Sequence, residues 1–479
     1  MQANKRLCLL LAGVLCLSLL CGCEAHTHVY EQTVIAPTCV SIGYTINVCD
    51  CGDVFYSDYR SETPHDFSDW ETGTEADLVH TGEELSYCKN CGELQIRKTE
   101  NLSALPKLFF SRGDDGNVDT LFFSGKELVF TCGAALNEEA NSEKPDFTLS
   151  LYRKENLSAF LTDFGWGMQS TYRLRGHYVD PVKARDRAGK AFWTTLSGLQ
   201  MGEDAESAPV AFPVQVYIGD EYLGMYDLCP DEQWEYRKEG ERTAALYSVD
   251  GQNNFTGMPV FSLPSLGEEK AGFAFLYCTG ESVDWAEESF TKFYSFVSES
   301  SDRVFKERLS RYTDTEMLID FYLTSVVLNV MTGLEDRAVW YTGDGVHWLP
   351  TFAEMSCSAG ITEKGTPCWH IYNLPPKDES GVIYKGSNLL WKRFVTLFRE
   401  EIMAKYTLLR ETIFSADILT GYYTRAVDES EAGLLDEELA LYPDTPKKSN
   451  SQTIGEFFAQ RLEALDPLFL ILSDENPSE

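Results

Sequence analysis

In one stretch of the chain, residues 347–362, an apolar segment is followed by a single acidic residue, a pattern that is typical of a metal-binding loop. The sequence "HWLPTFAEMSCSAGIT" closes an apolar run at Phe352 and then presents Glu354, small polar residues and Gly360. Hard divalent cations prefer carboxylate oxygens, and Glu354 is the one strong oxygen ligand in this stretch. An acid directly after an apolar strand is expected to be partly buried and therefore needs a cation or hydrogen bonds. A metal ion and a structural Lys or Arg partner both remain open.

A second group of residues with ligand chemistry lies near the N-terminus, where cysteines recur in two similar segments. Cys88 and Cys91 form a C-x-x-C-G knuckle, whose turn can present two thiolates to one tetrahedral zinc ion. An earlier copy has only C-x-C, at Cys49 and Cys51, with Cys39 upstream. Each copy, residues 28–58 and 65–98, begins with a His-x-aromatic start and has a Gly turn and a short strand-like stretch before its cysteines.

These cysteines are consistent with two kinds of cross-link, a zinc site or a disulfide. The second copy has no counterpart of Cys39, so a zinc site there needs His65 or His80 as a further ligand. Outside the cytoplasm the competing interpretation is a disulfide, for example Cys39 with Cys49 or Cys51. Either staple compensates for a segment that is too small to be held together by its own core.

The composition excludes one class of partner. The 479 residues include 40 Lys and Arg against 75 Asp and Glu, a net charge of −35. Such a chain repels phosphate backbones at long range, so we expect no nucleic-acid partner. With 43% hydrophobic residues the chain can bury a large core. It contains no nucleophile elbow, Walker loop, H-E-x-x-H or dinucleotide fingerprint.

The first 22 residues have the pattern of a removable leader. Lys5 and Arg6 precede the apolar run "LCLLLAGVLCLSLLCGC", and no later segment has 18 uninterrupted apolar residues. Leu20 and Cys23 resemble a bacterial lipobox, which implies cleavage before Cys23 and a lipid on its sulfur. An ordinary secretory signal with incidental cysteines is the alternative. The lipobox predicts a protein held by a lipid anchor on the outer face of the cell membrane.

Beyond residue 104 the hydrophobic pattern predicts an α+β domain. Alternating runs at 107–112, 120–125, 127–132 and 146–152 predict strands, and residues 180–199 predict a helix. The stretch 213–228 predicts a hairpin that turns at Gly219-Asp220. Apolar spacings of three and four predict helices over 315–333, 388–414 and 453–472. The expected domains are therefore a leader at 1–22, two repeats at 23–103 and a large domain at 104–479, with strands first and helices later.

The order of five motifs in the large domain resembles that of the spore coat protein H (CotH) kinase-like family. "FTCGAALNEEANSEKPDFTLSLY" resembles the family's "RGNSS…KKPYRIKL", and "YRLRGHYVDPVKARDRAGKAFW" its "W-x-L…D-x-x-x-x-R-N" segment. "VYIGDEYLGMYDL" resembles its "V-x-x-N-G-E-Y-x-G-x-Y-x-L" hairpin. "MLIDFYL" and "LLWKRFVTLFREEIMAKYTLLR" resemble two of its helices. The N-terminal copies resemble small zinc-ribbon-like modules.

This resemblance implies an atypical protein-kinase-like fold. It also implies an enzyme that transfers phosphate from ATP to Ser or Thr residues and uses Mg²⁺ or Mn²⁺. By register with the family's motifs, Lys144 would contact the phosphates and Arg185 would lie in the cofactor site. The alternative for Arg185, which follows Asp180 by five residues across a helix start, is a structural cap and ion pair. Asp336 would be the catalytic aspartate and Glu354 would hold the metal. The implied partners are a protein substrate or a surface protein, besides the membrane.

Several departures from the family's pattern favour a second hypothesis. The family's metal-binding D-x-D is Glu354-Met355-Ser356 here, and a serine hydroxyl is a weak ligand for a hard cation. The Asn that follows the family's catalytic aspartate is Arg337, and "RGNSS" has become "CGAAL". The alternative to an active kinase is thus a catalytically inactive, pseudokinase-like protein that binds or scaffolds at the cell surface.

Overall fold

The computed structural model divides the chain into two compact units, Met1–Leu102 and Ser103–Glu479. We describe each unit by itself. The leader, Cys23, Asp336 and Arg337 lie outside the described residues. The structure describes residues 27–139, 143–201, 210–231, 242–249, 254–262, 272–335, 338–362, 384, 386–445 and 451–469.

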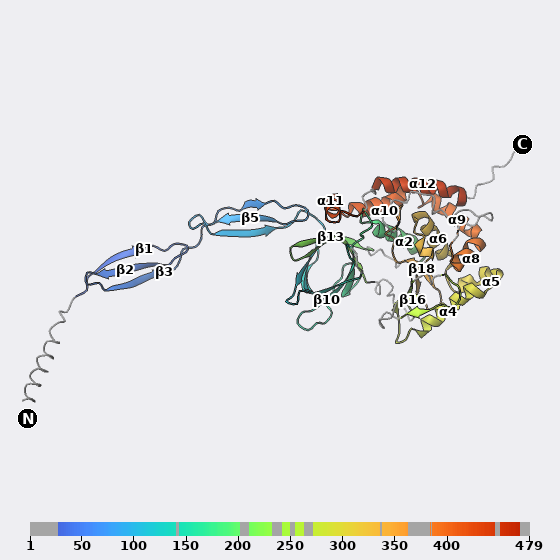
Figure 1. Cartoon of the computed structure of the whole chain (residues 1–479), viewed down its shortest axis with the longest axis horizontal. Coiled ribbons are helices and arrows are strands. Elements are labelled where there is room, and N and C mark those ends of the chain that lie inside the picture. Colours follow the sequence, from blue (N-terminus) through green and yellow to red (C-terminus); the bar gives the residue numbers. More distant parts are fainter. Residues whose placement is uncertain are drawn as a thin grey trace, which may run out of the picture. The chain divides into compact units, whose positions relative to one another are not determined.

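The first unit consists of two three-stranded antiparallel sheets, one for each repeat (Figure 1). In both sheets the middle strand carries most of the buried side chains and the outer strands are largely exposed. Neither sheet has a core of several packed layers, so other contacts must stabilise it. The strands are β1 (Tyr30–Ile35), β2 (Gly43–Cys49), β3 (Val54–Arg60), β4 (Glu71–Thr74), β5 (Gly82–Tyr87) and β6 (Leu94–Thr99).

The second unit begins with a closed seven-stranded barrel in the order β10-β11-β13-β12-β7-β8-β9. Its alternating apolar residues point inward, and Leu108, Leu149 and Val214 are completely buried. The predicted hairpin is confirmed, because Gly219-Asp220 lies between β12 and β13. The barrel strands are β7 (Lys107–Arg112), β8 (Val118–Ser124), β9 (Val129–Glu138), β10 (Phe147–Tyr152), β11 (Thr171–Arg175), β12 (Phe212–Ile218) and β13 (Glu221–Pro230).

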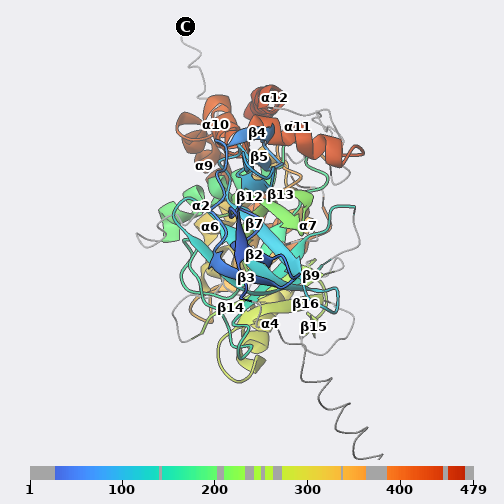
Figure 2. The ribbon, with the colours of Figure 1, turned by 90° about the vertical axis from the view of Figure 1, so that its left-hand side faces the viewer.

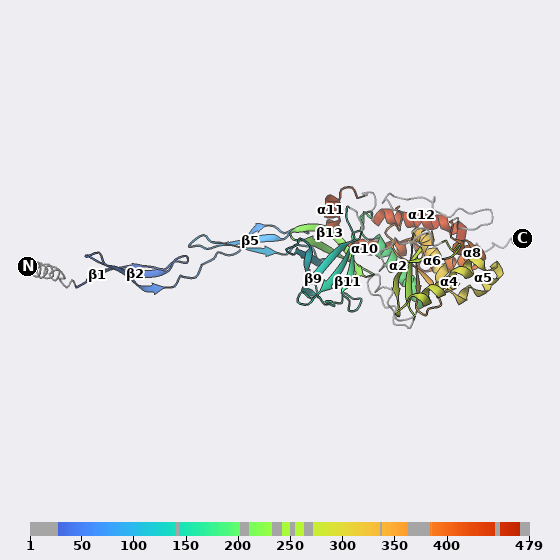
Figure 3. The ribbon, with the colours of Figure 1, turned by 60° about the horizontal axis from the view of Figure 1, so that its bottom comes forward.

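A five-stranded sheet of order β15-β16-β14-β17-β18 follows, and helices pack on it (Figure 3). Trp340, Trp348 and Trp391 are completely buried in the core that the sheet shares with these helices. The overall α+β class is confirmed. The order "strands first, helices later" is only roughly right, because this sheet is built from strands that alternate with helices. Its strands are β14 (Ala244–Val249), β15 (Phe261–Ser262), β16 (Gly272–Cys278), β17 (Ala338–Thr342) and β18 (Leu349–Phe352).

The helices of the second unit surround a central one. Asp314 caps this helix, α6, by accepting hydrogen bonds from the N–H groups of Glu316 and Met317. Every residue of α6 from Met317 to Leu328 is buried. Figures 1 and 2 show α10, α11 and α12 on one side of this unit and α4 on the other. In the described residues no helix combines the length and the apolar character that a membrane span requires. The helices are α2 (Arg185–Met201), α4 (Asp284–Glu299), α5 (Asp302–Arg308), α6 (Thr315–Leu328), α7 (Thr332–Glu335), α8 (Leu389–Leu397), α9 (Arg399–Glu411), α10 (Ala416–Asp428), α11 (Ala432–Leu441) and α12 (Ser451–Phe469).

Candidate functional site

Lys144, the predicted phosphate contact, lies in a fully enclosed ion pair. It stands just before β10, and its ammonium donates to the carboxylate of Glu438 on α11 and, at 2.5 Å, to the backbone oxygen of Met225 on β13. Neither the Lys144 nor the Glu438 side chain is exposed at all. The rings of Tyr226 and Tyr442 lie 4.6 and 5.3 Å from the ammonium. Carboxylate, carbonyl and aromatic faces thus surround the lysine.

A glycine of the hairpin motif makes room for this pair. Gly224 has a φ of +112°, and a Cβ added there would lie 2.6 Å from Oε2 of Glu438. The same carboxylate accepts a hydrogen bond of 2.9 Å from the Met225 N–H. A side chain at position 224 would therefore displace the partner of Lys144.

We expect Gly224→Ala to destabilise the second unit more than Gly219→Ala does. Both positions have positive φ, so both variants carry backbone strain, about 1–2 kcal/mol at Gly219, whose φ of +62° lies in the left-handed helical region, and more at Gly224, whose φ of +112° lies outside it. Nothing lies within 4 Å of a Cβ at Gly219, so the excess cost at Gly224 combines this added strain with the displacement of Glu438. Urea unfolding of the two variants checks this, and equal losses would show that Gly224 does not seat the carboxylate.

A second lysine lies beside the first. Lys183 is 3.8 Å from Glu438 and donates to the backbone oxygens of His177 and Tyr178 at 2.9 and 3.2 Å. Burial, together with the charge of Lys144, lowers the pKa of Lys183 to about 7. One carboxylate thus balances two closely spaced amines, and this leaves little excess positive charge to attract a phosphate.

A third cation joins the barrel to the helices. The guanidinium of Arg187, on α2, donates to the buried Asp227 on β13 and, at 2.6 and 2.9 Å, to the backbone oxygen of Ala426 and the hydroxyl of Ser430. Asp227 also meets Nε2 of His177 at 3.1 Å. Burial opposes the charged form of His177, but the hydrogen bond and charge of Asp227 outweigh this effect and raise the pKa of His177.

Arg185, the other predicted cofactor residue, is held in a structural pair. Its guanidinium donates to Asp180 at 2.5 Å, and the Asp180 carboxylate also accepts from the N–H groups of Val182, Ala184 and Arg185 at the start of α2. Both side chains are at most 1% exposed. This is the cap and ion pair that their spacing predicts.

The loop after β18 differs from the expected metal site. Glu354 is exposed, so the expectation that it is partly buried is wrong: β18 ends at Phe352, and the chain then turns Glu354 outward and Met355 inward. The hydroxyl of Ser356 donates to the Glu354 carboxylate. The second carboxylate of this region is Asp186, which accepts from the Met355 N–H at 2.6 Å.

Cations already balance that second carboxylate. Lys190 lies 3.2 Å from Asp186, and the charges of Lys190 and the half-buried Arg175 help to hold the pKa of Asp186 far below its usual range in spite of its burial. Arg175 also lies within the field of Glu354. A divalent cation placed here would face two fixed positive charges, so the arrangement disfavours metal binding.

Sequence reasoning found Lys144 and Glu354 but missed their partners. Glu438 stands 294 residues after Lys144, in no motif that could have indicated it. His177, which has no ligand spacing in the sequence, belongs to the network through its contact with Asp227. The predicted catalytic residue, Asp336, lies outside the described residues, so its role stays a prediction.

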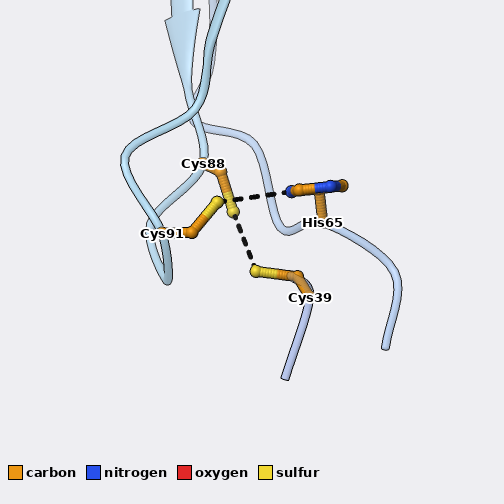
Figure 4. A group of neighbouring side chains, drawn as sticks. All are labelled: Cys39, His65, Cys88 and Cys91. Atoms are coloured by element: carbon orange, nitrogen blue, oxygen red, sulfur yellow. Dashed lines mark hydrogen bonds between the residues drawn. The ribbon is translucent and has the colours of Figure 1, made fainter. Parts of the chain in front are cut away.

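In the first unit the cysteines are grouped differently from the expected sets. Cys39 does not join Cys49 or Cys51, but lies with His65, Cys88 and Cys91, all four ligand atoms being within 4.8 Å of one another (Figure 4). The reason is that the loop between β1 and β2 lies against the second repeat. His80, the other histidine considered, is exposed and bonds Asp77 at 2.9 Å.

Cys49 and Cys51 have a histidine partner of their own. They lie with His28, again within 4.8 Å. The His-x-aromatic start, which the two repeats share at His28 and His65, was the signal that could have identified this ligand. Each repeat thus brings one histidine and one cysteine pair together, and both clusters could hold a metal ion.

The architecture places the second unit in the α+β class: a closed barrel followed by a helix-covered sheet, with buried acids and bases at their junction. The family model described as CotH kinase protein matches residues 137–429, more than half of the chain. The chain therefore belongs to the CotH kinase family. A search of curated proteins found no match.

Proposed function

We propose that this chain is a surface lipoprotein whose kinase-like CotH domain binds a protein partner and does not transfer phosphate. The observation that carries the proposal is the enclosure of Lys144. A phosphate-contacting lysine needs at least one open approach for an oxygen of the nucleotide. Here Glu438, the Met225 carbonyl and two tyrosine rings occupy the surroundings of the ammonium.

The acids near the predicted metal loop support the same proposal. Phosphoryl transfer needs a divalent cation to neutralise the charge that develops between the phosphates. Glu354 is bonded to Ser356, while Asp186 is balanced by Lys190 and Arg175. Among these described residues, no two carboxylates that lack such partners face a common position where an ion could bind. The family's chemistry has been replaced by contacts that stabilise the fold.

An active kinase is the second candidate, and one observation favours it. A buried Lys–Glu ion pair between a strand region and a helix is also what protein kinases assemble in their active state. Lys144 and Glu438 form such a pair. An active enzyme would keep this pair and would need an opening beside the Lys144 ammonium for a phosphate oxygen, with Asp336 to orient the acceptor hydroxyl.

The proposed location follows from the leader and supports binding over catalysis. Lipidation at Cys23 would hold the CotH domain on the outer face of the membrane, with the two repeats between anchor and domain. ATP is scarce in that compartment, whereas protein partners are abundant. The net charge of −35 favours a partner with a basic surface.

We expect millimolar ATP with Mg²⁺ or Mn²⁺ to leave the unfolding temperature of the CotH domain unchanged. A ligand at a hundred times its Kd would add about 2.7 kcal/mol of stability, which is easily detected. Tryptophan fluorescence is a suitable probe, since most tryptophans lie in Ser103–Glu479. A metal-dependent rise that Glu354→Ala or Asp336→Ala abolishes would establish the active-kinase candidate instead.

A further inference from the structure

Four ligand atoms of the first unit come together from three separate segments. Cys39 comes from the loop between β1 and β2 of the first repeat, and His65 from the start of the second repeat, before β4. Cys88 and Cys91 come from the knuckle between β5 and β6. Figure 4 shows the four side chains directed toward one another.

Two of the six spacings among these atoms match the edges of a tetrahedral zinc site, and all six are at most 4.8 Å. Bond lengths of about 2.3 Å for Zn–S and 2.0–2.1 Å for Zn–N give tetrahedron edges of about 3.8 Å between two sulfurs and 3.5 Å between sulfur and nitrogen. The Sγ atoms of Cys39 and Cys88 are 3.8 Å apart, and Sγ of Cys91 is 3.5 Å from Nδ1 of His65. A disulfide would need about 2.05 Å between the sulfurs.

The surroundings of the ligands also suit a metal. Nε2 of His65 lies 3.1 Å from the carboxylate of Glu93, an arrangement that leaves Nδ1 free of its proton and directed at the cluster. Backbone N–H groups of Asn90 and Cys91 point at the sulfur of Cys88, as they do around a thiolate in a zinc knuckle. These contacts orient ligands, and a disulfide would not require them.

The ligand set is shared between the repeats. Gly43 and Gly82 open the corresponding strands β2 and β5, which makes Leu78 the counterpart of Cys39. The two loops close with equivalent hydrogen bonds, from the Thr38 N–H to Ser41 and from the Asp77 N–H to His80. The first repeat therefore supplies a thiol that the second repeat cannot supply itself.

We propose that Cys39, His65, Cys88 and Cys91 bind one zinc ion and that this ion fixes the first repeat to the second. Binding releases the thiol protons and replaces the packed core that neither sheet possesses. Zinc thus makes one rigid body of the two repeats. The inference is independent of the proposed function, because every ligand lies in Met1–Leu102.

Zinc content of the purified full chain, kept reduced and equilibrated with zinc, tests the site. We expect Cys88→Ser/Cys91→Ser to bind one zinc ion fewer per chain than the wild type. The matched control is Cys278→Ser, which alters a half-buried cysteine on β16 of the other unit and should keep the wild-type content. Equal zinc content in the double variant and the control would overturn the proposal, as would a Cys39–Cys88 disulfide in a separate preparation purified without reductant.

Cobalt substitution tests the shared ligand. The thiolate-to-cobalt absorption of this site is the absorption of the wild type minus that of Cys88→Ser/Cys91→Ser. We expect this absorption to be about one third weaker in Cys39→Ser, because two of the three thiolates remain. An unchanged difference would exclude Cys39 as a ligand.

Proteolysis of the wild-type chain tests the joint without any variant. The exposed Arg60 ends β3, where the first repeat meets the second. We expect tryptic cleavage after Arg60 to accelerate when a chelator removes zinc and to slow again when zinc is restored. The same cleavage rate in both conditions would show that zinc does not join the repeats.

Discussion

Lys144→Met is expected to lower the free energy of unfolding of the CotH domain by about 3–5 kcal/mol. The substitution removes the nearer cation from the buried carboxylate of Glu438, which keeps the Met225 N–H as a donor and Lys183, at 3.8 Å, as a remaining cationic partner. Because burial helps to lower the pKa of Lys183 to about 7, this partner compensates only in part, and a poorly compensated buried charge is far more costly than a lost surface contact. Urea unfolding followed by tryptophan fluorescence measures the loss.

Two further variants make this result specific. Lys154→Met removes an exposed lysine that pairs with Asp119 at 3.1 Å, and should cost at most about 1 kcal/mol. Lys144→Met combined with Glu438→Leu should recover much of the stability, because Lys183, the other amine beside Glu438, has a pKa of about 7 and can become neutral when the carboxylate is removed. If Lys144→Met were as mild as Lys154→Met, the lysine would not have the structural role that we assign to it.

Arg187→Met is expected to cost a similar 3–5 kcal/mol, and its cost should depend on pH. Without Arg187, the buried Asp227 keeps His177 as its cationic partner. The pKa of His177 is raised in the folded protein, so its stabilising contribution is complete below the unfolded value of about 6.5 and is lost as the pH rises through the folded value. The wild type undergoes this loss too, but without Arg187 the charge of Asp227 acts on His177 alone and raises the pKa of His177 further. The variant therefore loses more stability than the wild type as the pH rises, and its deficit should widen.

Unfolding in urea at pH 6 and pH 9 measures this widening. Arg303→Met is the control, since Arg303 forms an exposed pair with Glu307 one helical turn away and should cost about 0.3–0.5 kcal/mol at either pH. A deficit for Arg187→Met that is the same at both pH values would mean that His177 does not share the charge of Asp227.

Local features of the fold could be predicted because local chemistry determines them. Gly219-Asp220 permits a tight hairpin turn, and Asp314 supplies an oxygen for the first N–H groups of α6. The pairing of Asp180 with Arg185 likewise follows from their spacing at a helix start. In each case the interacting groups are within five residues of one another.

The site depends on contacts that no short stretch encodes. Lys144 was found by its register with a family motif, but Glu438, which determines whether the lysine is available, is distant in the sequence and lies on a short helix without any motif. Cys39 was grouped with Cys49 and Cys51 because they are near in sequence. The packing of its loop against the second repeat places it with His65 and the knuckle instead.

The central claim is that Lys144 is a structural residue, closed to nucleotide, and its chemical reactivity tests this most directly. The folded chain is treated with a limiting amine acylating reagent, with and without Mg²⁺ and ATP, and the modification of each lysine is measured by mass spectrometry. We predict that Lys144 stays unmodified in both conditions while the exposed Lys154 reacts readily. Acylation of Lys144 at a rate similar to that of Lys154, suppressed by Mg²⁺ and ATP, would contradict the account and identify an open nucleotide site.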